Sequence, residues 1–65
     1  MTALIPPRDE APLLTVEEAA RFLRLSRAKT YALAASGDLP SVRLGKSVRI
    51  PRARLMAWLD AQSRL

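Results

Sequence analysis

The feature that most constrains this chain is that its 65 residues include neither cysteine nor histidine. A domain of this size buries only about 60% of the surface that its unfolded chain exposes, and many small domains are therefore stapled by disulfides or zinc. Here disulfides, Cys/His zinc sites, cysteine nucleophiles and histidine acid–base catalysis are all excluded. The six acidic residues are scattered and form no catalytic constellation. The sequence therefore predicts a packed domain that is no enzyme and holds no cofactor or metal.

The basic residues are concentrated in the middle of the chain. Residues 21–54 contain nine lysines and arginines against the single acid Asp38, whereas residues 1–20 carry a net charge of −3. A segment with a net charge of +8 attracts a polyanion such as nucleic acid. A merely solvated basic surface would have the same composition, so charge alone leaves both interpretations open.

No segment predicts export or membrane insertion. The longest apolar run is Leu55–Leu59, far below the ~20 residues that span a bilayer, and residues 1–7 contain no basic leader. We therefore expect an unprocessed cytoplasmic protein without a membrane partner, and the absence of cysteine fits a reducing compartment.

The first helix is predicted by its start signal. Residues 1–12 contain three prolines and no apolar period, which favours a flexible N-terminal arm. Thr15 and Glu18 have the spacing of a capping box, in which each side chain bonds the backbone N–H of the other residue. The apolar residues that follow lie on one helical face and predict a helix from Val16 to Leu23: Val16, Ala19, Ala20 and Leu23.

A second helix follows after only three residues. Ser26 is a good N-cap, and Gly37 is a natural residue to end the helix. The stripe of Thr30, Leu33 and Ala34 would face the core, with the Thr30 hydroxyl bonding back to the preceding turn. Two short helices joined by residues 24–26 predict a helix-turn-helix, although many helical hairpins share this spacing.

The last third of the chain predicts a hairpin and one more helix. In residues 41–44 and 47–50 polar and apolar side chains alternate, and a glycine-bearing turn separates the two segments. This pattern is typical of two antiparallel strands. Residues 52–62 form the final helix, whose predicted buried stripe is Leu55, Trp58, Leu59 and Gln62. We thus predict an α+β, mainly helical fold of three short helices and a two-stranded hairpin over residues 13–62, with a tail at 63–65.

Several sequence blocks together resemble a known family. They are Leu14–Ala20, Leu25–Arg27 with Tyr31, Ser36–Pro40, Val42–Lys46 and Arg49–Arg52. In this order and at this spacing they resemble the excisionase family of DNA-binding domains. The resemblance implies a MerR-like winged helix-turn-helix, in which the second helix enters the major groove and the hairpin, as the wing, contacts the neighbouring backbone or minor groove. Three positions depart from the family pattern: Lys29 replaces a common threonine, Thr30 a common valine, and Val48 a common large aromatic in the wing.

The candidate DNA-binding residues lie on the second helix and the wing. Arg27 is placed to reach base edges or a phosphate, Lys29 to meet a phosphate, and Tyr31 to pack with its hydroxyl near the backbone. Alanines 28, 32 and 35 turn outward, and alanine cannot make the bidentate hydrogen bonds that read guanine or adenine. The helix set is Ser26, Arg27, Ala28, Lys29 and Tyr31, and the wing set is Arg43, Lys46, Ser47 and Arg49.

Three functions remain open at this stage. The leading hypothesis is an accessory factor that binds double-stranded DNA cooperatively and bends or organises it for a tyrosine integrase. Neighbouring copies would meet through Glu17 and Glu18 against Arg52 and Arg54. The alternatives are a small AlpA-like transcriptional regulator with the same module, and an antitoxin-like adaptor whose basic surface binds an acidic protein.

Overall fold

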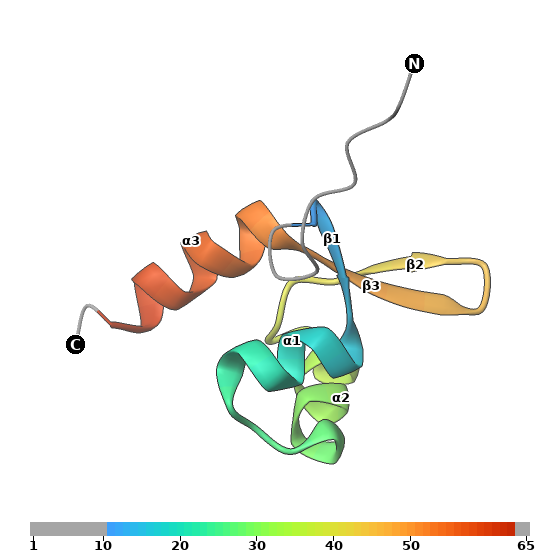
Figure 1. The fold of residues 1–65 in the computed structure, drawn as a ribbon, viewed down its shortest axis with the longest axis horizontal. Coiled ribbons are helices and arrows are strands. Elements are labelled where there is room, and N and C mark those ends of the chain that lie inside the picture. The colour runs from blue at the N-terminus through green and yellow to red at the C-terminus, as the bar shows by residue number, and fades with distance from the viewer. Residues whose placement is uncertain (1–10, 64–65) are drawn as a thin grey trace.

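The computed structural model describes residues 11–63, which form three helices around a small sheet (Figure 1). The elements, in chain order, are β1 (Leu13–Thr15), α1 (Val16–Leu23), α2 (Arg27–Ser36), β2 (Val42–Leu44), β3 (Ser47–Pro51) and α3 (Arg52–Gln62). The predicted arm lies outside the described residues except for positions 11 and 12, and so does the tail except for Ser63. The predicted fold class of three helices with a hairpin wing is confirmed.

Local capping fixes where the first two helices begin. The Thr15 Oγ1 accepts from the Glu18 backbone N–H at 3.0 Å, and Glu18 Oε1 accepts from the Thr15 N–H at 2.9 Å, which completes the predicted capping box. At the start of α2, Ser26 Oγ accepts from the Lys29 N–H at 3.0 Å. Both starts are as predicted, because each depends on side chains within one turn.

The turn between α1 and α2 is closed by a left-handed residue. Arg24 has φ 59, and its N–H bonds to the carbonyl of Arg21, while the Leu25 N–H bonds to the carbonyl of Ala20. This pair of bonds is the Schellman arrangement, which satisfies carbonyls at the end of a helix. Glycine usually holds such a position, so an arginine there is strained. The two helices are consequently joined by a short, hydrogen-bonded turn.

The sheet has one strand more than predicted. The strand order is β1-β3-β2, and both pairs are antiparallel. β1 pairs Leu14 with Ile50 and ends at Thr15, which also caps α1. The hairpin is thereby attached to the start of the helix-turn-helix along its inner half, while its outer half projects as the wing (Figure 1).

The core lies between the sheet and the helices. Its buried members are Leu14, Val16, Ala19, Leu39, Ile50 and Leu55, and Trp58 packs against them while remaining half-buried. Leu14 and Leu39 were not among the predicted core residues, although both are about 1% exposed. The prediction that Gln62 belongs to the buried stripe of α3 is wrong, because Gln62 is exposed. The last turn of α3 extends beyond the sheet (Figure 1), and its residues Ala61 and Gln62 are exposed to solvent.

Neither a membrane-spanning helix nor a metal-binding cluster is found in residues 11–63. No helix there has the length and apolar character needed to cross a bilayer. No three acidic side chains in that range come together in a way that could hold a metal ion.

Candidate nucleic-acid interface

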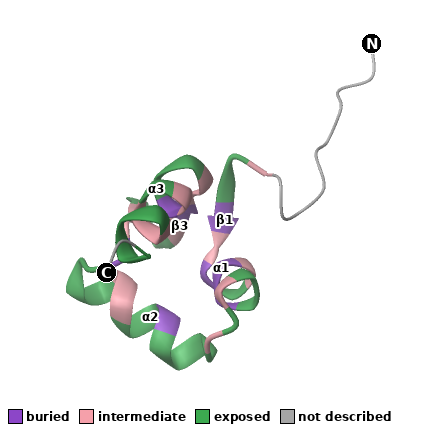
Figure 2. Cartoon of the chain, turned by 90° about the vertical axis from the view of Figure 1, so that its left-hand side faces the viewer, coloured by how far each residue is buried: buried purple, intermediate pink, exposed green. Residues whose placement is uncertain are grey.

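The second helix is anchored by one side and presents the rest to solvent. Thr30 is its one fully buried residue, and its hydroxyl donates to the Ser26 carbonyl at 2.9 Å, as predicted. Leu33 and Ala34 are half-buried, whereas alanines 28, 32 and 35 are exposed (Figure 2). The predicted outward alanine surface of α2 is therefore present. It lacks hydrogen-bonding side chains along the middle of the helix.

The register of the hairpin places its basic residues on different faces. Arg49 lies opposite Val42 on β2 and Thr15 on β1, whereas Arg43 lies opposite Val48. Because side chains alternate along a strand, Arg43 shares the face of Val48 and the buried Ile50, while Arg49 is on the other face. The wing cations thus do not form one row.

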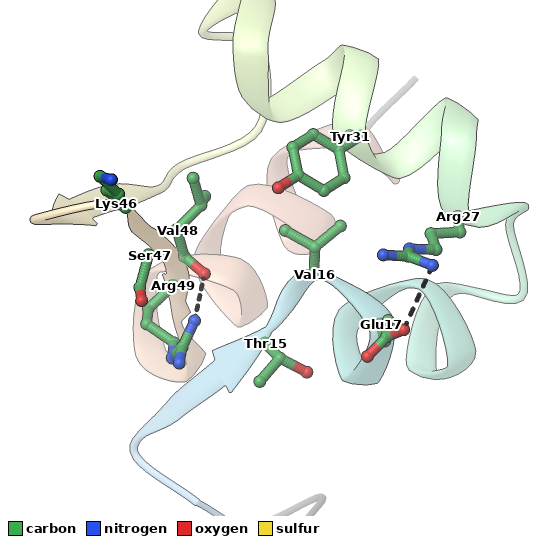
Figure 3. A pocket seen from close by; sticks show the side chains of 9 residues that line it. All are labelled: Thr15, Val16, Glu17, Arg27, Tyr31, Lys46, Ser47, Val48 and Arg49. Carbon is green, nitrogen blue, oxygen red and sulfur yellow. Dashed lines mark hydrogen bonds and ion pairs between the residues drawn. The ribbon is translucent and has the colours of Figure 1, made fainter.

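A groove separates the wing from the starts of both helices (Figure 3). We call it the wing groove, and it has a volume of about 330 Å³. The start of α1 contributes Thr15, Val16 and Glu17, α2 contributes Arg27 and Tyr31, and the hairpin contributes Lys46, Ser47, Val48 and Arg49. It follows the open edge of β3, beyond the point where β1 ends. Three of the predicted DNA-binding cations and Ser47 therefore meet around one hollow.

A second hollow lies on the other side of Tyr31. We call it the rear hollow; it has a volume of about 240 Å³ and is lined by Tyr31, Ala34, Ala35, Ser41, Val42, Arg43 and Val48. Tyr31 and Val48 belong to both hollows. Val48 is half-buried and Tyr31 is 47% exposed. The two hollows therefore meet at Tyr31 and at the small side chain of Val48.

The wing groove contains one acid among its cations. Glu17 Oε2 lies 3.4 Å from Arg27 Nη1, and both side chains are about two-thirds exposed. Figure 3 shows the Arg27 guanidinium directed across the groove toward α1. Opposite it, the Arg49 Nη1 donates to the Val48 carbonyl at 2.9 Å, while Lys46 is exposed at the turn. Arg27 and Arg49 are thus held by protein groups, and Lys46 extends into solvent.

The other predicted site residues lie around these hollows. Ser26 is engaged as the α2 cap, and Ala28 and Lys29 are exposed beside it without lining either hollow. Of the residues predicted to join neighbouring copies, Glu17 faces Arg27 and Glu18 closes the capping box. Arg52 begins α3, half-buried, with its N–H bonded to the Pro12 carbonyl, and Arg54 is exposed.

Sequence reasoning missed how Glu17 and Val48 contribute to this surface. From the sequence, Glu17 is predicted to contact a neighbouring copy, and its place in the first turn of α1 also favours the helix dipole. Its position opposite Arg27 depends on how α1 and α2 cross, which no local pattern reports. Val48 is predicted from the sequence to be small for the family, but only the three-dimensional structure shows that it lines both hollows.

Comparison with known proteins agrees with this geometry. A family model described as "Helix-turn-helix domain" matches residues 13–63, which is nearly all of the described chain. The chain belongs to this helix-turn-helix family. The match begins at the first residue of β1 and extends through α3, so the family unit includes the wing as well as the two helices.

Curated relatives of the chain have names that fit the family. A "Probable excisionase" of Saccharopolyspora erythraea is 63% identical, over 75% of this chain and 57% of the relative. Two relatives from Mycobacterium tuberculosis strains, provisionally named as DNA-binding proteins, are each 47% identical over 58% of this chain and 49% of their own length. The chain thus spans about half the length of these relatives. No solved structure gives a significant match. The resemblance to excisionases predicted from the sequence is confirmed.

Proposed function

We propose that this helix-turn-helix protein binds double-stranded DNA through α2 and the wing. The observation that carries the proposal is the convergence of Arg27, Lys46 and Arg49 around the wing groove, beside the exposed surface of α2. A helix enters the major groove of DNA, and flanking cations neutralise phosphates. The names of the relatives support the same kind of ligand.

We further propose that binding serves site-specific recombination. In this role the protein would bend or organise DNA for a tyrosine integrase; the name of one relative, "Probable excisionase", supports the recombination role and says nothing of the integrase. A small transcriptional regulator is the second candidate, because the names of the Mycobacterium tuberculosis relatives say only that those proteins bind DNA and so fit either role. Both roles use the same DNA-binding surface, so they differ in assembly and in partner proteins.

The alanine surface of α2 limits what one copy can read. Alanine offers a methyl contact to thymine but no bidentate hydrogen bond to guanine or adenine. Direct readout then rests on Arg27, Lys29 and Tyr31, while the wing senses backbone shape. Cooperative binding of several copies to adjacent sites compensates for weak readout by each. We propose that neighbouring copies meet through Glu17 and Glu18 of one copy and Arg52 and Arg54 of the next. Glu17 and Glu18 would make this contact while keeping their bonds within their own chain, to Arg27 and to the Thr15 N–H.

Gel-shift titration on probes with one, two or three adjacent sites tests the cooperative assembly. The sites are first obtained by in vitro selection from a randomised duplex library. The expected result is an affinity per site that rises with the number of sites, for a protein that sediments as a monomer without DNA. Equal affinity per site would refute cooperative assembly, and a stable dimer free in solution would favour the regulator.

A further inference from the structure

The ion pair inside the wing groove contributes little to the fold. Glu17 Oε2 and Arg27 Nη1 are 3.4 Å apart, and their side chains are 62% and 68% exposed. An exposed pair in high dielectric contributes little to folding stability. Glu18, its neighbour, already completes the capping box at the start of α1. An acid facing the cations of a DNA-binding groove is unfavourable for phosphate binding, so its presence there calls for a functional reason.

We propose that Glu17 is a specificity-determining residue that positions Arg27 for base contact and disfavours its binding to phosphate. This inference rests on the proposed duplex binding. A guanidinium has five N–H donors in a planar fork. Glu17 engages Nη1 from one side, so the remaining donors of Arg27 stay available to a base edge while the pair is kept.

Glu17 then affects the binding of selected and random duplexes differently. On a random duplex Arg27 has no matching base edge and gains most by turning to a phosphate, which requires the pair to break. On a selected duplex Arg27 keeps its place, and the preordered side chain loses less freedom on binding. The Glu17 carboxylate repels phosphates in both complexes. This repulsion lowers the affinity for both duplexes, and it is offset only in the selected complex, where Glu17 also positions Arg27.

The test is the substitution Glu17→Gln, measured on a duplex with one selected site and on a mixed-sequence duplex of the same length, both too short for a second copy, so that the proposed contact between copies does not contribute. Affinity for the mixed-sequence duplex should rise about three- to ten-fold at low salt, because one repelling charge is removed and Arg27 is released to phosphate. Affinity for the selected duplex should change less than about two-fold, because lost positioning offsets the lost repulsion. The ratio between the two affinities should therefore fall at least about 1.5-fold.

Two further variants separate positioning from net charge. Asp60→Asn makes the same charge change on the exposed side of α3, which points away from the wing (Figure 1), and should leave the ratio unchanged. In an Arg27→Ala background there is no side chain to position, so Glu17→Gln should tighten both duplexes by the same factor. The thermal unfolding midpoint should fall by less than about 8 °C in Glu17→Gln, because the acid in the first turn of α1 and its exposed ion pair together contribute about 1 kcal/mol or less.

The outcomes are distinguishable from failure of the proposed function. If the unaltered protein binds no duplex, duplex binding itself is refuted. If the unaltered protein binds duplexes but selection enriches no sequence, there is no specificity for Glu17 to determine and this proposal is wrong. Equal tightening of both duplexes by Glu17→Gln in the unaltered background, or no tightening of the mixed-sequence duplex, would also overturn it.

Discussion

Two threonine hydroxyls form hydrogen bonds in the first turns of the two helices of the helix-turn-helix, and removing them should change the free energy of unfolding by different amounts. Thr30 is completely buried, and its hydroxyl donates to the Ser26 carbonyl, which also accepts the Thr30 backbone N–H at 3.0 Å. Thr15 Oγ1 instead accepts the Glu18 N–H at 3.0 Å, and a donor in the first turn of a helix has no carbonyl partner within the helix. The same change, threonine to valine, therefore leaves the Ser26 carbonyl satisfied in one case and the Glu18 N–H unsatisfied in the other.

The expected changes in the free energy of unfolding follow from these hydrogen-bond partners. In Thr30→Val the loss of one hydrogen bond costs about 1 kcal/mol, and the methyl group buried in its place returns about 0.8 kcal/mol. The free energy of unfolding should thus change by less than about 1 kcal/mol. Thr15→Val removes the cap and the reciprocal geometry of the box, which costs about 1–2 kcal/mol. In a domain of this size that loss lowers the melting temperature by about 4–8 °C per kcal/mol.

Urea and thermal unfolding followed by circular dichroism measure both variants. Duplex affinity of Thr30→Val should stay unchanged, because the substitution leaves the exposed surface of α2 as it is. A loss of more than about 1.5 kcal/mol in Thr30→Val would show that the buried hydroxyl stabilises α2 beyond its single bond. Thr15→Val as stable as the unaltered protein would refute the role of the capping box.

The remaining predictions concern the cations of the wing groove. Arg27→Ala should cost about 1–3 kcal/mol on a selected duplex and relax the preference at one base position; equal weakening of selected and random duplexes would make Arg27 a phosphate ligand only. Lys46→Ala should weaken all duplexes about equally and make the slope of log K against log salt shallower by about one unit, which fluorescence anisotropy at several salt concentrations measures. An unchanged slope would show that Lys46 makes no phosphate contact.

The helix boundaries were predictable because they depend on local signals. Thr15, Ser26 and Gly37 each act within one turn of the residues that they cap, and the helices begin and end where these residues indicate. The strand β1 was not predictable in the same way. Leu13–Thr15 is too short to show a period, and it becomes a strand only by pairing with β3 far along the chain. Leu39 is buried for a similar reason, because the chain turns back over the core after α2.

The candidate site was predictable in composition and not in arrangement. Charge and resemblance indicate which cations belong to the surface, but only the pairing of β2 with β3 places Arg43 and Arg49 on opposite faces. Likewise, the contact between Glu17 and Arg27 joins two helices whose crossing depends on the strained turn at Arg24. The proposed specificity of this surface thus depends on tertiary geometry that a linear pattern does not contain.

The salt dependence of duplex binding tests the central claim most directly. We propose that five cations of α2 and the wing contact phosphates: Arg27, Lys29, Arg43, Lys46 and Arg49. Neutralising four to six phosphates predicts that log K falls with log salt at a slope of roughly −4 to −5 on a mixed-sequence duplex. A slope near zero, or no binding at about 50 mM salt, would contradict duplex binding through this surface and favour an acidic protein as its partner.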